Sequence, residues 1–314
     1  MIPRSSRPFD AAVLEAVDGW GAHTAAAAVI DRDGLVASHG PLDRMLPWAS
    51  VTKLVTACVV LLGVQRGMLA LDDAAGPPGA TVRHLLAHAG GYGFDGGVLA
   101  VPGRTRIYSN AGFDALGRVL EDAAQRPFAE LLGEWVLEPL AMTGTRLEGR
   151  PSEGLVGPAS DLAAFARELL APTILPAGLV TEAAAVAFPG LRGVLPGFGL
   201  QDPCDWGLGF EVRGRKSPHW TGSANSPATF GHFGRSGTFL WVDPVAGLAL
   251  ACLTDRPFGA WAGEAWPALS DAVLAAAAGE GGAGARGGAG LIARTDRPGA
   301  LEPSPTSPRS PARP

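Results

Sequence analysis

The sequence predicts an α+β protein in which an antiparallel sheet, flanked by helices from both ends of the chain, carries an inserted and mostly helical lobe. Strand-like segments occur at 25–40 and again after residue 206, whereas residues 49–205 show mainly helical patterns with Gly and Pro breaks. Strands need partners, so we expect the two distant groups to complete one sheet. Clefts between such lobes are common places for small-molecule sites.

The sheet part is predicted from the two ends of the chain. Residues 9–18 repeat apolar side chains at helical intervals, and residues 25–40 predict two strands joined by a tight Asp33-Gly34 turn. Later segments predict three strands and a closing helix, at 207–214, 237–243, 247–255 and 265–279.

The helical part begins near Ser50, directly before a long apolar run from Leu54 to Leu69 that predicts a buried helix. Further helical patterns lie at 81–90, 110–125 and 159–170. We therefore expect one domain over residues 1–278, with a sheet part at about 9–48 and 206–278 and a helical part at about 49–205. Residues 279–314, rich in Gly, Pro and Ser, are predicted to be a disordered tail.

The composition limits the classes of partner. A formal net charge of −5 and a pI of about 5.7 give no basic footprint for nucleic acid or an anionic membrane, so we expect a small-molecule substrate. No stretch is long and apolar enough for a membrane span, and residues 1–21 lack the apolar core of a secretory signal. We therefore expect a cytoplasmic location. The oligomeric state is left open.

The cysteines predict neither a disulfide framework nor a metal site. Cys58, Cys204 and Cys252 are odd in number, far apart in sequence and without a C-x-x-C pair. We interpret each as a small buried side chain, and we expect no metal and no cofactor.

The first motif with chemical potential is Ser50-x-x-Lys53. At the start of a helix this spacing puts both side chains on one face. A serine hydroxyl needs a neighbouring base, and a lysine becomes one when burial lowers its pKa. Among 25 basic residues only two are lysines, so a lysine here suggests a need for an amine that loses its proton. The plainer alternative is that Ser50 caps the helix and Lys53 lies on its exposed first turn.

Two further segments extend this motif. Tyr108, one of two tyrosines, opens Tyr-Ser-Asn ahead of a helix, where a phenol can relay a proton and the Asn110 amide can orient a carbonyl or the lysine. Alternatively, Tyr108 is a half-buried aromatic residue and Asn110 a helix cap. The segment His232-Phe233-Gly234 precedes a strand, and glycines there allow close approach of a ligand to the backbone.

Taken together, these segments resemble the serine β-lactamase and penicillin-binding-protein superfamily, closest to class C β-lactamase-related esterases and D-alanyl-D-alanine peptidases. The stretch "ASVTKLVTA" is similar to the first motif of that group, "IYSN" to the second and "GHFGRSGT" to the third. Flanking segments such as "HLLAHAGGY" and "WGLGFEV" also match, and the resemblance covers about residues 9–278 in order. It implies a β-lactamase-like fold.

The resemblance also implies roles for individual residues. Ser50 would be the acylated nucleophile, with Lys53 and Tyr108 sharing the transfer of its proton. Asn110 would contact the acyl side chain of the substrate or hold Lys53. The backbone N–H groups of Ser50 and Arg235, which follows Gly234, would form the oxyanion hole.

One departure from the family pattern bears on the substrate. Class C β-lactamases carry Lys-Thr-Gly at the third motif, whereas His232 and Phe233 occupy the first two positions here. A neutral imidazole beside a bulky ring suits an uncharged ester or amide better than an anionic β-lactam, although Arg235 offers a carboxylate contact instead. The sequence therefore predicts a serine hydrolase acting on a small ester or amide through an acyl-enzyme.

Several alternatives stay open. They are a β-lactamase or D-alanyl-D-alanine carboxypeptidase, a biosynthetic acyltransferase, and a binding module that has kept the fold without turnover. An α/β-hydrolase is disfavoured because no G-x-S-x-G elbow occurs. His84 and His88 lack the glutamate of a zinc-protease motif, so we expect them to pack or hydrogen-bond within the helical part. Trp220 and Trp241 are expected to be core or cleft walls.

Overall fold

A computed structural model of the chain describes residues 9–279, and residues 280–314 of the predicted tail lie outside the described residues. The central sheet has six antiparallel strands in the order β2-β1-β11-β10-β9-β8. Their bounds are β1 Ala25–Asp31, β2 Gly34–His39, β8 Glu211–Val212, β9 Phe230–Phe233, β10 Phe239–Asp243 and β11 Leu248–Thr254. The expected α+β architecture is confirmed, because β1 from the beginning of the chain pairs along its whole length with β11.

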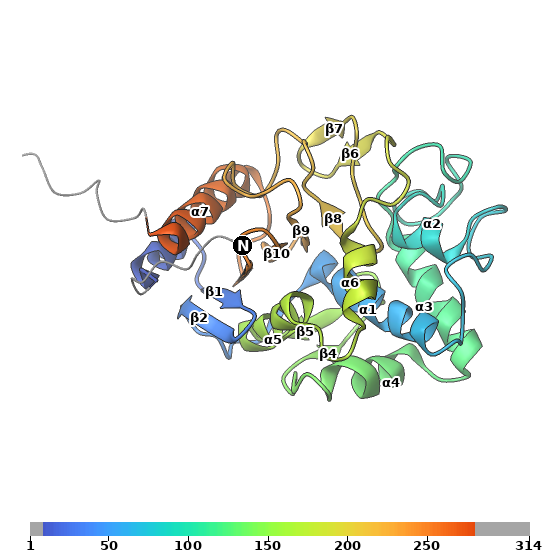
Figure 1. The fold of residues 1–314 in the computed structure, drawn as a ribbon, viewed down its shortest axis with the longest axis horizontal. Coiled ribbons are helices and arrows are strands. Elements are labelled where there is room, and N and C mark those ends of the chain that lie inside the picture. Colours follow the sequence, from blue (N-terminus) through green and yellow to red (C-terminus); the bar gives the residue numbers. More distant parts are fainter. Residues whose placement is uncertain (1–8, 280–314) are drawn as a thin grey trace, which may run out of the picture. The chain divides into compact units, whose positions relative to one another are not determined.

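The register of the sheet separates two apolar layers. On β1, Ala27 and Val29 point to one face and Ala28 and Ile30 to the other, as the period of two requires. The first face is covered by helices from the two ends of the chain, η1 (Ala11–Trp20) and α7 (Ala260–Ala278). Figure 1 shows α7 and η1 on one side of the sheet and α5 on the other. The prediction of terminal helices on one face is therefore confirmed.

The opposite face of the sheet packs against the helical part of the chain. Its helices are α1 (Thr52–Gln65), α2 (Val82–Leu86), α3 (Asn110–Ala124), α4 (Phe128–Leu132), η3 (Gly133–Leu137), α5 (Ala159–Leu170) and α6 (Ala177–Ala184). Of these, α5 lies directly on β1, β10 and β11.

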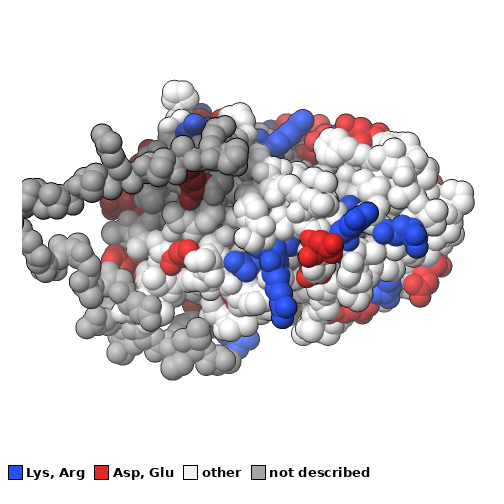
Figure 2. Space-filling model, turned by 90° about the horizontal axis from the view of Figure 1, so that it is seen from above, with Lys and Arg blue, Asp and Glu red and all other residues white. Residues whose placement is uncertain are grey.

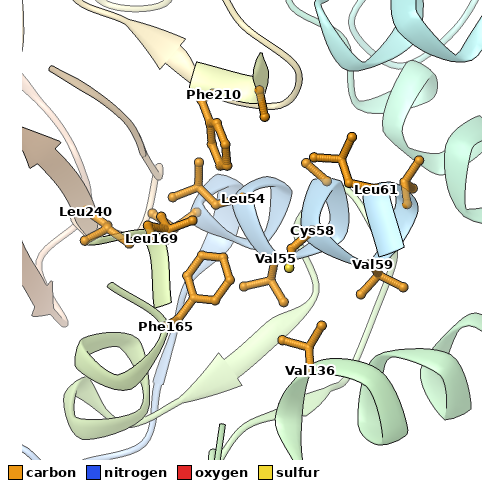
Figure 3. Packing of buried hydrophobic residues seen from close by; sticks show 14 of the residues in the cluster. Leu54, Val55, Cys58, Val59, Leu61, Val136, Phe165, Leu169, Phe210 and Leu240 are labelled. Atoms are coloured by element: carbon orange, nitrogen blue, oxygen red, sulfur yellow. The ribbon is translucent and has the colours of Figure 1, made fainter. Parts of the chain in front are cut away.

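Helix α1 is buried all round. Every residue from Thr52 to Gly63 is buried, because sheet-side and lobe-side elements both pack on the helix. Figure 3 shows its apolar side chains pointing in several directions, toward Phe165 of α5, Val136 of η3 and Phe210. A helix enclosed in this way fixes the position of Lys53 in its first turn and of Ser50 in the turn directly before it.

Some predicted boundaries were wrong, and some short strands were not predicted. The first helix is a 3₁₀-helix shifted to Ala11–Trp20, and α7 begins at Ala260 instead of residue 265. Five short strands were not predicted: β3 (Leu46–Pro47), just before the helical part, and, within it, β4 (Arg146–Leu147), β5 (Leu155–Gly157), β6 (Gly193–Leu195) and β7 (Gly199–Gln201). Strands of two or three residues are too short to show a hydrophobic period.

Two surface properties bear on the class of partner. Among residues 9–279, no helix combines the length and apolar character needed to cross a membrane. On the face shown in Figure 2, outside the grey residues, basic and acidic side chains are interspersed among uncharged ones.

Candidate active site

Ser50 lies in a single 3₁₀ turn, η2 (Ala49–Val51), that leads directly into α1. Its neighbour Ala49 has a φ of 46°, an uncommon conformation for a residue with a Cβ atom. Neither η2 nor α1 has a side-chain cap, so the alternative role of Ser50 as a helix cap is wrong. Strained backbone of this kind is typical of functional sites.

The second residue of the motif, Lys53, is fully buried at 0% exposure, which excludes the exposed-turn alternative. Its Nζ donates to Asn110 Oδ1 at 2.7 Å and to the Ser152 carbonyl at 2.8 Å, and lies 3.4 Å from Ser50 Oγ. All three contacts are with neutral oxygen atoms. The structure therefore brings the amine of Lys53 and the serine hydroxyl together, and no carboxylate contacts the amine.

The surroundings of Lys53 favour a neutral amine. Burial lowers the pKa of Lys53 to about 7, and the more distant carboxylates of Glu153 and Asp114 only partly oppose this effect. The amine also lies 4.8 Å from the centre of the Tyr108 ring. A substantial fraction of the amine is thus unprotonated near neutral pH and able to accept a proton.

Tyr108 presents its hydroxyl to the same space. The ring is half-buried, and its buried hydroxyl makes no hydrogen bond of good geometry with described residues. Burial raises the pKa of Tyr108, and the nearby Ser50 hydroxyl only partly offsets this rise. The phenol is therefore neutral, so it suits the relay of a proton better than service as a standing base.

Asn110 is the first residue of α3, and the cap of that helix is Ser109, whose Oγ accepts from the Gly112 N–H at 3.0 Å. The alternative role of Asn110 as the cap is therefore wrong. Its Oδ1 holds Lys53, and its Nδ2 lies 3.4 Å from Asp95 Oδ1. Of the two roles expected for Asn110, positioning the lysine is the one with a direct contact.

The third motif reaches Ser50 from the edge of the sheet. Gly234 follows β9, and a Cβ atom there would lie 2.6 Å from the Trp48 carbonyl oxygen and 3.1 Å from the Ser50 nitrogen. Only glycine lets these two backbones meet without a shift. Arg235 comes next, with its side chain 82% exposed and 3.7 Å from Glu153. The backbone after β9 thus lies beside the nitrogen of Ser50.

His232 is buried and neutral. Burial, together with the charge of Lys53, lowers the pKa of His232 to about 3. Its Nδ1 donates to the Phe233 carbonyl at 2.6 Å, which leaves Nε2 as a buried acceptor without a partner. The ring centre lies 5.6 Å from that of Tyr108. The imidazole therefore adds no positive charge to the site.

His88 packs against the ring of Tyr108, although the sequence did not place it in the site. Its Nδ1 accepts from the Ser109 N–H at 3.1 Å, and its ring packs on Tyr108 with centres 4.7 Å apart. His88 has a φ of 53°, and burial keeps its pKa well below the ordinary value. The expectation that it packs within the helical part is confirmed, as it is for His84, which stacks on Phe188.

A pocket of about 520 Å³ opens beside Ala49. Its walls carry charged side chains, since Arg150, Glu153 and Arg235 all line it. Arg150 donates to Glu153 at 2.6 Å and to Asp114 at 3.1 Å. The pocket therefore has room for part of a small substrate next to the serine.

The second lysine of the chain lies in a different buried cluster. Lys216 forms an ion pair with Glu211, which also accepts from the Trp220 Nε1–H at 2.9 Å and contacts His219 Nε2 at 3.1 Å. Burial would raise the pKa of Glu211, but Lys216 and His219 outweigh it and bring the pKa to about 2. This cluster is saturated with partners and offers no free base.

The cysteines and the two tryptophans are buried, as expected. Cys58, Cys204 and Cys252 are all free and buried. Trp220 and Trp241 are core residues. Within residues 9–279, no group of three or more His, Cys, Asp or Glu side chains is arranged to hold a metal ion.

The sheet with its terminal helices, the enclosed helix α1 and the Ser-x-x-Lys turn at its start define the β-lactamase-like class of folds. The chain belongs to the Beta-lactamase family, whose model matches residues 9–275. This match confirms the resemblance seen in the sequence motifs. Proteins of this family are generally serine hydrolases.

Known structures agree with this assignment. The crystal structure of a β-lactamase from Mycobacterium bovis is 51% identical, with a TM-score of 0.83 over 84% of this chain and 98% of that one. EstCE1, described as a hydrolase with promiscuous acyltransferase activity, is 18% identical, with a TM-score of 0.69 over 84% of this chain and 97% of that one. At that level of identity the likeness concerns the fold alone.

A curated relative has a different described activity. The "Putative D-alanyl-D-alanine carboxypeptidase" of Escherichia coli O157:H7 is 25% identical over 203 residues, which cover 50% of this chain and 46% of that protein. The chain thus spans about half the length of this relative.

Proposed function

We propose that the protein is a serine hydrolase that acts on a small uncharged ester or amide through an acyl-enzyme on Ser50. One observation carries this proposal: a buried lysine without a contacting carboxylate lies 3.4 Å from the serine hydroxyl. A binding module without turnover has no need of such an amine, whose burial costs stability.

The geometry supports a two-step reaction. The unprotonated Lys53 accepts the proton of Ser50, directly or through the Tyr108 hydroxyl, as the serine oxygen attacks the substrate carbonyl. Backbone N–H groups of Ser50 and Arg235 stabilise the oxygen that becomes negative. The proton then passes to the leaving group, and water repeats the sequence to release the acid.

The character of His232 favours an uncharged substrate. A neutral imidazole stands where a lysine of class C β-lactamases would meet a carboxylate, so that attraction is missing. Arg235 favours the alternative activity, a D-alanyl-D-alanine carboxypeptidase or β-lactamase, because its exposed guanidinium lines the pocket beside Ala49. A biosynthetic acyltransferase would use the same acyl-enzyme with another acceptor.

Intact-protein mass spectrometry tests the proposal. The protein is exposed briefly to a p-nitrophenyl ester, a fluorophosphonate or a penicillin. Ser50→Ala is treated in the same way, as is the matched control Ser236→Ala, whose serine lines the pocket beside Ala49. We expect adducts on the native protein and on Ser236→Ala, but none on Ser50→Ala. The reagent that turns over then distinguishes an esterase from a β-lactam-recognising enzyme. If no reagent labels the native protein, the acyl-enzyme proposal is wrong for these substrate classes.

A further inference from the structure

The segment 91–103, between α2 and Tyr108, presents large apolar side chains to solvent. Its sequence, GYGFDGGVLAVPG, contains one charged residue, Asp95. Four of its apolar side chains are from 52% to 71% exposed; we call them the apolar rim: Phe94, Val98, Leu99 and Val101. Soluble proteins rarely expose such a group of side chains unless it binds something.

The rim is held in place by backbone hydrogen bonds. Gly93 N–H donates to the Gly97 carbonyl at 2.9 Å, and Leu99 N–H donates to the Gly91 carbonyl at 2.8 Å. The Phe94 carbonyl accepts from the N–H groups of Asn110 and Ala111 at 2.7 and 3.1 Å. The exposed side chains are therefore presented by a fixed backbone tied to the first turn of α3.

The rim is continuous with the candidate active site. The Phe94 ring lies 5.9 Å from the Tyr108 ring, measured between centres. Its backbone partner Asn110 is the residue that holds Lys53. Phe94 therefore adjoins the candidate active site through Tyr108 and Asn110, and Leu99 packs close to the backbone of the neighbouring Gly93.

The charged pocket beside Ala49 contrasts with this surface. Arg150, Glu153 and Arg235 line that pocket, whereas the four side chains of the rim are hydrocarbon. The one charged residue of their segment, Asp95, lies 3.6 Å from Arg150. The transfer of an aliphatic or aromatic chain from water to such a surface is therefore favourable.

We propose that the apolar rim binds the acyl group of the substrate, so that the enzyme prefers esters of medium-chain or aromatic acids over acetyl esters. This inference rests on the proposed acyl-enzyme at Ser50. Each methylene group that reaches the rim is expected to raise kcat/KM about two- to fourfold until the rim is covered.

A series of p-nitrophenyl esters tests the inference, from acetate through butyrate and hexanoate to octanoate. The variants are Phe94→Ser and Leu99→Ser, and the matched control is Leu35→Ser, which removes a side chain 54% exposed on β2. We expect the ratio of kcat/KM for octanoate to that for acetate to fall about tenfold in each rim variant. The control should keep the ratio of the native protein.

The outcomes separate this inference from the proposed function. If the native protein hydrolyses the esters but shows no rise with chain length, the inference is wrong and the acyl-enzyme stands. If the native protein reacts with no ester and no fluorophosphonate, the proposed function fails first. If the rim variants change only the molecular mass measured in solution, the rim covers a second copy of the chain, and the acyl-group assignment is overturned.

Discussion

The two lysines of this chain are both buried, yet their surroundings differ in one respect. Lys216 contacts the carboxylate of Glu211, whereas Lys53 contacts an amide oxygen, a backbone carbonyl and a hydroxyl. A contacting carboxylate stabilises the charged amine, and neutral acceptors do so much less. The comparison teaches that two buried lysines of one chain can differ in the charge of the groups they contact, and that only Lys53 has the neutral contacts expected of a proton acceptor.

The largest expected effect concerns activity. Lys53→Met should lower the rate of Ser50 acylation by about a thousandfold or more, because the serine loses its base. Lys216→Met should keep the rate per folded molecule within a few-fold of the native value. Fluorophosphonate labelling rates, corrected for the folded fraction by circular dichroism, measure both. Equal losses of labelling rate in the two variants would contradict the difference expected between the two lysines.

The next effect concerns stability and should have the opposite order. Lys216→Met leaves the buried Glu211 charge without its main partner and should cost about 3–5 kcal/mol of unfolding free energy. Lys53→Met removes an amine whose burial destabilises the folded state. The free energy of unfolding should therefore stay level or rise by about 1–2 kcal/mol. Urea denaturation at pH 7 compares them. A Lys53→Met protein as unstable as Lys216→Met would contradict this.

The pH dependence of acylation is a smaller effect at neutral pH. The lowered pKa of Lys53, about 7, means that the base is protonated below this value and free above it. The acylation rate should therefore rise about tenfold per pH unit below pH 7 and level off above it. Single-turnover rates from pH 5 to 9, with Ser50→Ala subtracted as background, give the profile. A rate that falls as pH rises would exclude a neutral lysine as the base.

Glu211 should produce a separate pH effect on stability. Its pKa in the folded state, about 2, lies below the ordinary value of about 4.3. Its contribution is therefore fully present above about pH 5 and is lost as the pH falls toward 2. Urea midpoints measured from pH 7 down to pH 3 should fall more steeply in the native protein than in Glu211→Gln.

The smallest effect concerns His88. His88→Phe keeps an aromatic ring but removes the acceptor for the Ser109 N–H, and should lower kcat about tenfold as Tyr108 loses its position. His88→Asn keeps an acceptor near the same place and should recover part of the loss. Steady-state kinetics with one ester measure kcat and KM for both. If His88→Phe keeps the native kcat while His88→Asn loses it, ring packing rather than the hydrogen bond positions Tyr108.

Much of this site was predictable from sequence because its motifs are local. Ser50 and Lys53 lie three residues apart, and a helix start places them on one face wherever that helix lies. The terminal strands were likewise visible from their short apolar runs and, for the first pair, from the Asp33-Gly34 turn. The β-lactamase-like fold followed from the three motifs in order.

The rest depends on contacts that no local pattern contains. The pairing of Lys216 with Glu211 joins the irregular segment after β8 to the first residue of that strand. The rarity of lysine was nevertheless a signal that pointed to Lys216 as well. His88 supports Tyr108 through a backbone N–H 21 residues away. The five short strands are too brief to show a period and form only because neighbouring segments bring their backbones together.

The pairing of β1 with β11 has a consequence for how the protein is made. Ser50 emerges from the ribosome early, but the backbone around Gly234 that meets it belongs to the last third of the chain and is held by the sheet that β11 completes. Contacts of such long sequence separation form late in folding. In a half-synthesised chain, Ser50 therefore lacks the backbone of the third motif that lies beside it in the folded protein. Covalent labelling of Ser50 during folding would therefore begin only after β1 and β11 have paired.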